Sequence, residues 1–294
     1  MTQPTAIADA LVLDGGTGTE LDRRGVDISL PLWSARAIID APQTLLEVHR
    51  DYLLAGADLI TANTFRTHRR SLAKAGVADR AAELTMRAVA IAREACRQFE
   101  PRARVLGSVA PLEDCYSPDL VPDVSACNVE HAEMIDHLAQ AGADLILIET
   151  MMHPREAEAA ADAARQRMPG AWMMSFCVRS EGPPGILLSG HPVIDLLDRV
   201  GDAWAVGINC VAAPAVEANV KLLRELLPGT VRIAAYANIG LVDEYGNWVR
   251  SDGADPVRYA EYTKRWQDAG ASIIGGCCGT TPAHIKAVRD MLRQ

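Results

Sequence analysis

Short apolar runs rich in Val, Ile, Leu and Ala recur along the chain, and segments with an apolar residue every three or four positions separate them. Short runs of β-branched residues are typical of buried strands, whereas the three-to-four spacing is typical of helices that bury one face. The runs predict eight strands, at 11–13, 57–65, 104–111, 144–150, 172–178, 203–210, 231–238 and 272–276. The spacing predicts helices at 43–55, 77–99, 128–141, from 154 onward, and at 191–200, 214–227, 256–269 and 282–292.

Strands that alternate with helices over 294 residues indicate an α/β fold, a single-domain (β/α)8 TIM barrel that spans residues 1–294. Internal echoes agree with this prediction. The phrase Ala-Gly-Ala-Asp-Leu-Ile begins at Ala55 and again at Ala141, and a near copy begins at Ala269. Each copy places a glycine where a helix ends and a strand is about to begin, which is the usual position of a helix carboxyl cap. We find no linker or low-complexity segment.

Unusual polar and sulfur-bearing residues follow the predicted strands. Barrel enzymes carry their sites at the carboxyl ends of the strands, so these side chains are expected to meet at one rim. The residues are Asp14, Asn63, Glu149, Asn209, Cys210, Asn238, Cys277 and Cys278.

The adjacent Cys277 and Cys278 follow Gly275-Gly276, where the backbone can leave the regular strand. Two thiols at a strand end suit a zinc ion, which favours sulfur ligands, and Cys210 is the best third candidate. Three thiolates with one open position are typical of a catalytic zinc site. Two other interpretations stay open: a cysteine that is simply a small buried apolar residue, and a non-catalytic zinc or redox sensor. The remaining cysteines are assigned to packing or chance, namely Cys96, Cys115, Cys127 and Cys177.

Asp14 and Glu149 each end an apolar run with a carboxylate. Either acid could form a salt bridge or cap a helix instead. The turn Gly15-Gly16-Thr17 offers backbone N–H groups with little steric cover, which suits a small anion. Together, the two acids would bind the amine of an α-amino acid and the turn would bind its carboxylate.

Composition limits the partners. The net charge of −9 and the pI near 5.3 argue against nucleic acid as the main partner. No apolar stretch approaches the roughly 20 residues that span a bilayer, and residues 1–10 do not resemble a signal peptide. Seven cysteines without the spacing of a disulfide scaffold indicate a cytoplasmic protein. A homo-oligomer stays open.

Six motifs follow one another along nearly the whole chain: Asp14-Gly15-Gly16-Thr17-Gly18-Thr19, Asn63-Thr64-Phe65, Ile148-Glu149-Thr150, Gly207-Ile208-Asn209-Cys210, Tyr236-Ala237-Asn238 and Gly275-Gly276-Cys277-Cys278-Gly279-Thr280. Together they resemble the zinc-dependent homocysteine S-methyltransferase family. The resemblance implies a barrel with Zn²⁺ on the three cysteines, and homocysteine held through its amine by Asp14 and Glu149 and through its carboxylate by the turn at Gly15, Gly16 and Thr17. It also implies that Asn238 lies at or near the metal and that Asn63 lies in the substrate site.

The resemblance leaves the methyl donor open. Lack of room for folate and corrinoid domains favours a sulfonium donor, S-methylmethionine or S-adenosylmethionine. A betaine- or corrinoid-dependent reaction, and another thiol or a selenol as acceptor, are the alternatives. Trp33, Phe65 and Tyr236 could form an aromatic wall for a cationic donor. The basic segment 67–70 and the sequence of residues 239–245 do not favour such a donor. His153 is interpreted as a loop histidine at a helix start.

Overall fold

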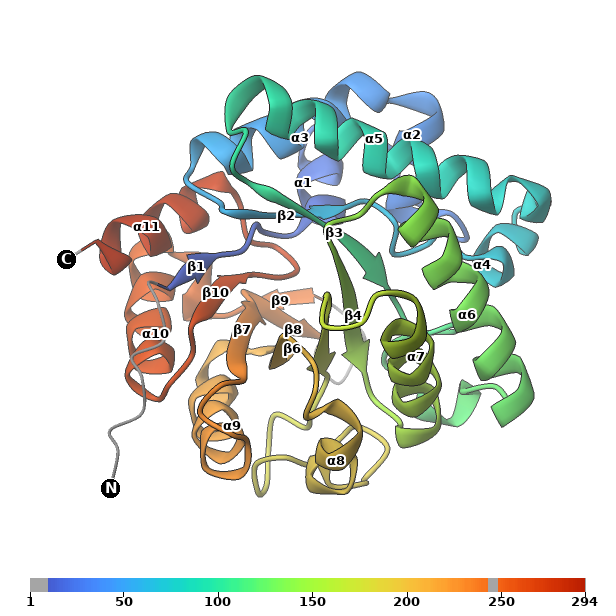
Figure 1. The fold of residues 1–294 in the computed structure, drawn as a ribbon. Helices are drawn as coiled ribbons and strands as arrows, with labels where there is room; N and C mark the ends of the chain where they lie inside the picture. The colour runs from blue at the N-terminus through green and yellow to red at the C-terminus, as the bar shows by residue number, and fades with distance from the viewer. Residues whose placement is uncertain (1–9, 243–247, 294) are drawn as a thin grey trace.

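The computed structural model describes residues 10–242 and 248–293 and shows a ring of parallel strands surrounded by helices (Figure 1). The expectations about a signal peptide and about Asp243, Glu244 and Tyr245 therefore concern residues outside the described ones, apart from residue 10. None of the described helices is long and apolar enough to cross a bilayer.

Eight parallel strands form the barrel, in the order β1-β10-β7-β6-β5-β4-β3-β2. A parallel bridge between Leu13 and Leu59 joins the two outer strands and closes the ring. The predicted (β/α)8 barrel is confirmed. The strands are β1 (Leu11–Val12), β2 (Leu59–Ala62), β3 (Arg104–Val109), β4 (Leu145–Met151), β5 (Trp172–Phe176), β6 (Ala205–Ala212), β7 (Arg232–Asn238) and β10 (Ile273–Gly276).

The helices cover the outside of the barrel, and most lie where the spacing predicts them. Short 3-10 helices at 33–35, 78–80, 118–120, 193–196 and 252–254 join some of them. The α-helices are α1 (Thr17–Arg23), α2 (Arg36–Asp40), α3 (Pro42–Leu54), α4 (Arg69–Ala73), α5 (Ala81–Phe99), α6 (Val124–Ala141), α7 (Pro154–Arg167), α8 (Leu197–Val200), α9 (Ala213–Leu226), α10 (Pro256–Asp268) and α11 (Pro282–Leu292).

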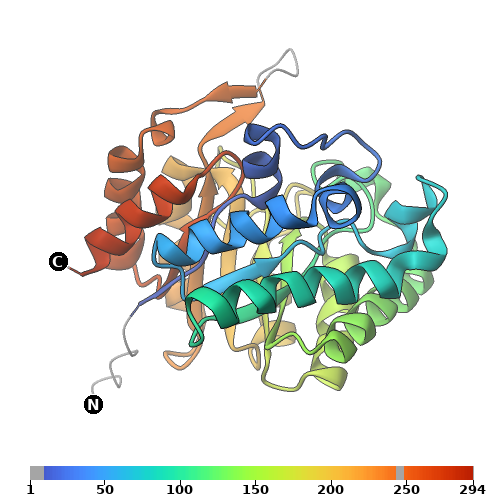
Figure 2. The same cartoon turned by 90° about the horizontal axis from the view of Figure 1, so that it is seen from above.

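Three predictions about elements were wrong in detail. Helix α6 begins four residues before the predicted start because the Asp123 side chain accepts a hydrogen bond from the Ala126 N–H at 2.8 Å and caps it. The predicted helix 191–200 is a 3-10 turn followed by the one-turn α8. The expected glycine-rich loop after β7 contains an antiparallel hairpin, β8 (Gly240–Val242) with β9 (Trp248–Arg250), which projects beyond the barrel body (Figure 2).

The repeated Ala-Gly-Ala phrase marks the helix-to-strand corners as expected. Gly56, Gly142 and Gly270 all have positive φ, at 105°, 79° and 112°. Residues with a Cβ rarely adopt this conformation, so glycine ends each helix and turns the chain into the next strand. Each corner lies at the end of the barrel where strands begin, so the loops at the opposite end are free to carry the chemistry.

Candidate active site at the carboxyl ends of the strands

A cavity of about 520 Å³ opens where the strands end. It gathers residues that lie far apart in the sequence, and every predicted site residue lines it except Asn209 and Asn238. The predicted residues on its wall are Asp14, Gly15, Gly16, Thr17, Trp33, Asn63, Phe65, Glu149, Cys210, Tyr236, Cys277 and Cys278.

The three predicted zinc ligands meet in this cavity. The Sγ atom of Cys210 lies 3.2 Å from that of Cys277 and 3.9 Å from that of Cys278, and all three lie within 4.8 Å of one another. A tetrahedral zinc with Zn–S bonds of about 2.3 Å needs sulfurs about 3.8 Å apart. The Cys277 thiol donates to Cys210 and lowers the pKa of Cys210 well below its ordinary value, which favours the thiolate that a metal needs. This donor set fits zinc.

Unusual backbone points Cys210 into the cavity. The pairing of β6 with β7 shifts register between Asn209 and Ala212, and Cys210 inside this bulge has φ of +57°. Thr150 shows the same pattern at the end of β4, with φ of +61° at a register shift. Such conformations cost on the order of 1–3 kcal/mol each for residues other than glycine and cluster at functional sites.

Cys277 and Cys278 are held by the neighbouring β7. The Cys277 N–H donates to the Ala237 carbonyl at 2.9 Å, and the Cys278 N–H donates to Asn238 Oδ1 at 3.1 Å. Asn238 therefore lies beside the cysteine pair without lining the cavity. The structure places it as a support for Cys278, adjacent to the metal site that the resemblance implies.

Asp14 is buried at the end of the strand-one segment. Its carboxylate accepts hydrogen bonds from the Thr61 N–H and the Thr61 hydroxyl, both at 2.8 Å. Burial raises the pKa of Asp14 to about 8, although these hydrogen bonds oppose the shift. The residue is only 2% exposed, yet it lines the cavity, so it can receive a buried ligand.

Glu149 is the second buried acid of the cavity. The Ser108 hydroxyl donates to its Oε1, and burial raises the pKa of Glu149 to about 7. A cationic group bound beside these two acids would offset the cost of ionising them, so the pair is suited to a positively charged ligand.

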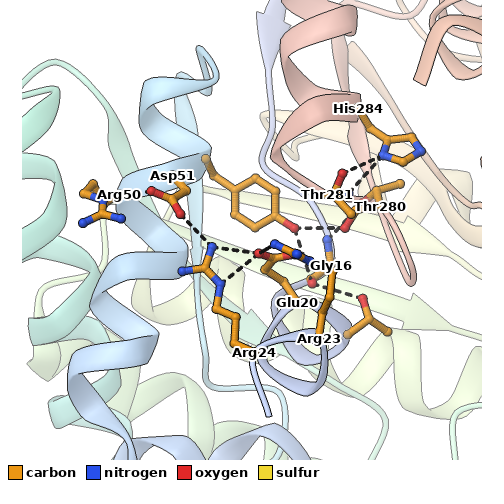
Figure 3. Close-up of polar contacts among 11 residues, drawn as sticks. Gly16, Glu20, Arg23, Arg24, Arg50, Asp51, Thr280, Thr281 and His284 are labelled. Carbon is orange, nitrogen blue, oxygen red and sulfur yellow. Dashed lines mark hydrogen bonds and ion pairs between the residues drawn. The ribbon is translucent and has the colours of Figure 1, made fainter. Parts of the chain in front are cut away.

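The glycine turn after Asp14 packs directly against the cysteine segment. A Cβ on Gly16 would lie 2.7 Å from the Cys277 carbonyl oxygen, so only glycine permits this approach. The Gly16 N–H donates to Thr280 Oγ1 at 3.1 Å, and the Tyr52 hydroxyl donates to the Thr280 carbonyl, also at 3.1 Å (Figure 3). The Gly16 N–H is thus already hydrogen-bonded within the protein. Fewer N–H groups of the turn are therefore free to bind an anion than the sequence predicted.

An ion-pair network fixes α1, which follows this turn. Glu20 is buried and accepts hydrogen bonds from Arg23 and Arg24, and Arg24 also pairs with Asp51 of α3 at 2.7 Å (Figure 3). A buried carboxylate is tolerable here because two guanidinium groups compensate its charge. The network fixes α1, and with it the turn, against α3.

An aromatic pair lies on the cavity wall. The rings of Trp33 and Phe65 meet edge to face with centroids 5.6 Å apart. The Asn63 side chain donates to the Ser34 carbonyl at 2.7 Å and so holds the segment that carries Trp33. Tyr236 lies deeper, within the apolar layer inside the barrel.

Other cavity residues were not found from the sequence. Cys115, which the sequence assigned to packing or chance, lines the cavity beside Tyr116. The sequence did hold one indication of their role: their loop follows the carboxyl end of β3, where barrel enzymes carry their sites. The cavity residues that sequence reasoning missed include Thr61, Arg66, Lys74, Ser108, Asp114, Cys115 and Tyr116.

The basic segment 67–70 does not reach the cavity. Arg69 pairs with Glu133, and Arg70 pairs with Glu130 and Glu113. The basic residues that do line the cavity are Arg66 and Lys74.

His153 also lies outside the cavity wall. It caps α7 by accepting a hydrogen bond from the Arg155 N–H at 3.1 Å. The interpretation as a loop histidine at a helix start is confirmed.

Comparison with known proteins agrees with the site. Residues 11–292 match the family model described as Homocysteine S-methyltransferase. Homocysteine S-methyltransferase 3 of Arabidopsis thaliana is 35% identical, over 96% of this chain and 89% of that protein. Selenocysteine Se-methyltransferase of Brassica oleracea is 32% identical, over 96% and 88%. The metallated form of the homocysteine methyltransferase MmuM from Escherichia coli superimposes with a TM-score of 0.82 at 32% identity, over 96% of each chain. The chain therefore belongs to the homocysteine S-methyltransferase family.

Proposed function

We propose that this protein transfers a methyl group from a sulfonium donor to the thiol of homocysteine and so forms methionine. The observation that carries the proposal is the meeting of three cysteine sulfurs and two buried carboxyl groups on the wall of one cavity. The sulfurs suit a metal that binds a substrate thiol, and the carboxyl groups suit the amine of an amino acid.

Cys210, Cys277 and Cys278 would hold Zn²⁺. When bound, the ion supplies a Lewis acid that lowers the pKa of a substrate thiol, so that the sulfur is nucleophilic at neutral pH. The chain itself then needs no dedicated general base. The bulge at Cys210 and the amide contact of Cys278 with Asn238 hold the sulfur positions in advance.

Asp14 and Glu149 bind the homocysteine ammonium group, and the turn formed by Gly15, Gly16 and Thr17 faces its carboxylate. The Thr61 and Ser108 hydrogen bonds orient the two acids. Asn63 acts indirectly, through the segment that carries Trp33. Together these contacts orient the substrate sulfur toward the three cysteines.

The donor binds beside the Trp33–Phe65 pair, whose π faces attract a sulfonium cation, with Tyr236 deeper in the same wall. The carbon–sulfur bond of the donor breaks and leaves its electron pair on the donor sulfur, which becomes a neutral thioether. The homocysteine sulfur supplies the pair for the new carbon–sulfur bond. S-Methylmethionine and S-adenosylmethionine are the favoured donors, and a betaine- or corrinoid-dependent reaction is the alternative.

A panel of donors with homocysteine tests the proposal, with methionine followed by mass spectrometry. We expect methionine from a sulfonium donor and none from the zinc-free protein. Selenocysteine as acceptor belongs in the same panel, because a Brassica oleracea relative is named for that activity. Zinc-loaded protein that forms no methylated product with any of these pairs would refute the proposal.

The rival of another class is a zinc or redox sensor without catalysis. A sensor has no use for an amino-acid site, so homocysteine should not protect its zinc from a chelator. We propose that the protein is an enzyme and not a sensor, that it acts in the cytoplasm, and that residues 1–294 form one domain. The raised pKa values of Asp14 and Glu149 support a built amino-acid site.

A further inference from the structure

Tyr116 reaches the cysteine cluster from the far side of the barrel mouth. It lies in the segment 110–123 between β3 and α6, whereas Cys210 lies in β6, and two strands separate β3 from β6 in the sheet. The Tyr116 hydroxyl nevertheless lies 3.0 Å from the Cys210 Sγ. A side chain that crosses the mouth and ends on a metal ligand covers part of the site from above.

The Tyr116 hydroxyl joins a chain of hydrogen bonds around the cysteines. The Asn238 Nδ2 donates to the Tyr116 hydroxyl at 3.5 Å, and Asn238 Oδ1 accepts from the Cys278 N–H at 3.1 Å. One tyrosine and one asparagine thus connect Cys210 with the backbone of Cys278. Tyr116 and Asn238 therefore link two of the three proposed zinc ligands, Cys210 and Cys278.

The direction of the Tyr116–Cys210 hydrogen bond follows from the chemistry. A phenol with an ordinary pKa near 10 keeps its proton at neutral pH, and a thiolate has no proton to give. The hydroxyl therefore donates to Cys210 whenever that cysteine is a thiolate. Three thiolates exceed the charge of one divalent cation, so a donor on one of them offsets excess negative charge.

The loop that carries Tyr116 is anchored at Glu113. Arg70 and Lys74 both form ion pairs with the Glu113 carboxylate, and Arg66 donates to its carbonyl oxygen at 3.2 Å. Three cations from the segment after β2 therefore hold the base of the loop. This anchoring accounts for the basic residues near the cavity without assigning them to a ligand.

Within the loop, Asp114 fixes the position of Tyr116. The Asp114 side chain accepts a hydrogen bond from the Tyr116 N–H at 2.8 Å, and the Ser117 N–H donates to the Asp114 carbonyl at 3.1 Å. These contacts form a tight turn next to the anchor at Glu113. Although Tyr116 is 47% exposed, its backbone is thus held in a defined place.

We propose that Tyr116 is a positioning residue of the metal centre, which donates a hydrogen bond to the Cys210 thiolate and holds the 110–123 loop across the cavity mouth. The inference rests on the proposed zinc site. It adds a ligand-stabilising residue from a loop that carries none of the motifs of the family resemblance. Zinc affinity reports this role without a measurement of turnover, since the Tyr116 hydroxyl contacts Cys210.

Tyr116→Phe removes only the hydroxyl and tests this directly. We expect the variant to bind zinc about tenfold or more weakly in competition with a chelator, the effect of one hydrogen bond to a charged group. With cobalt in place of zinc, the sulfur-to-metal charge-transfer band should move to lower energy, because Cys210 becomes a stronger electron donor. Tyr262→Phe is the matched control, since its hydroxyl donates to Asp252 on the protein surface.

Glu113→Gln tests the anchor while it keeps the Tyr116 hydroxyl. It should weaken zinc binding in the same direction, and thermal melting verifies that both variants fold. Zinc affinity and a cobalt spectrum in Tyr116→Phe that match the parent would overturn the proposal, and an unaltered affinity in Glu113→Gln would overturn the anchoring step. Methionine formation by the parent protein separately decides the proposed function.

Discussion

Asn209 holds Thr150 through both ends of its amide. The Oδ1 atom accepts from the Thr150 N–H at 3.0 Å, and Nδ2 donates to the Thr150 hydroxyl at 2.9 Å. The two residues lie immediately before Cys210 and immediately after Glu149. One buried amide therefore connects the bulged ends of β6 and β4, and so connects a proposed metal ligand with a proposed substrate ligand.

Asn209→Ala should therefore destabilise the fold and loosen the site at once. The substitution leaves the buried Thr150 N–H without its partner, which costs about 1–3 kcal/mol. We expect a loss of that size in the free energy of unfolding, measured by urea denaturation, together with weaker zinc binding. Thr150→Ser keeps the hydroxyl and should retain most of the unfolding free energy and most of the zinc affinity. An equal loss in the two variants would contradict the proposed role of the Asn209–Thr150 hydrogen bonds.

Asp14→Asn and Glu149→Gln should each raise the KM for homocysteine by about 10- to 100-fold, the worth of a hydrogen bond to a charged group. The affinity of the parent should also rise with pH through about 7 to about 8, because both acids must ionise to pair with the ammonium group. Steady-state kinetics measures the KM values, and isothermal titration with homocysteine across this pH range measures the affinity. A KM that neither substitution alters would exclude the two acids from the substrate site.

Asp14 should also make the zinc-free protein less stable as the pH rises. Its folded pKa of about 8 lies above its ordinary value of 3.8, so the folded protein binds this proton more tightly than the unfolded chain does. The contribution is fully present below 3.8 and is lost as the pH rises towards 8.

In Asp14→Asn the fall in unfolding free energy between about pH 5 and about pH 8 should be smaller by more than about 1 kcal/mol. The uncharged amide can keep the contacts with Thr61, since it offers both an acceptor and a donor. Glu225→Gln, exposed on α9, is the control and should leave the slope as it is. Parallel curves for the parent and Asp14→Asn would contradict the buried, protonated Asp14.

Phe65→Leu should weaken donor binding selectively. Loss of a cation–π contact of about 1 kcal/mol predicts a roughly fivefold higher KM for a sulfonium donor, with the KM for homocysteine nearly the same. Steady-state kinetics with each substrate varied in turn measures the split. An equal change in both KM values would remove Phe65 from the donor site.

The sequence was sufficient for the barrel because alternation of strands and helices, with glycine at each corner, depends on local patterns. It was also sufficient to predict that Cys210, Cys277 and Cys278 lie together, since the carboxyl ends of the strands share one rim in any barrel. The β8–β9 hairpin was not predicted because neither strand exceeds three residues. A pattern of that length does not differ from a loop.

Tyr116 and Cys115 were missed for a different physical reason. They belong to an irregular loop, and its path across the cavity depends on ion pairs at Glu113 with residues about 40 positions away. No periodic pattern records such tertiary contacts. The same contacts explain why Arg70 lies outside the cavity wall.

X-ray absorption at the zinc edge tests the central claim most directly, namely that three protein sulfurs leave room for the substrate sulfur. The account predicts three sulfur ligands at about 2.3 Å in the purified zinc protein and a fourth when homocysteine is added. Cys278→Ala should lose the zinc together with turnover. A sulfur count that homocysteine does not change, or full methionine formation by metal-free Cys278→Ala, would contradict the account.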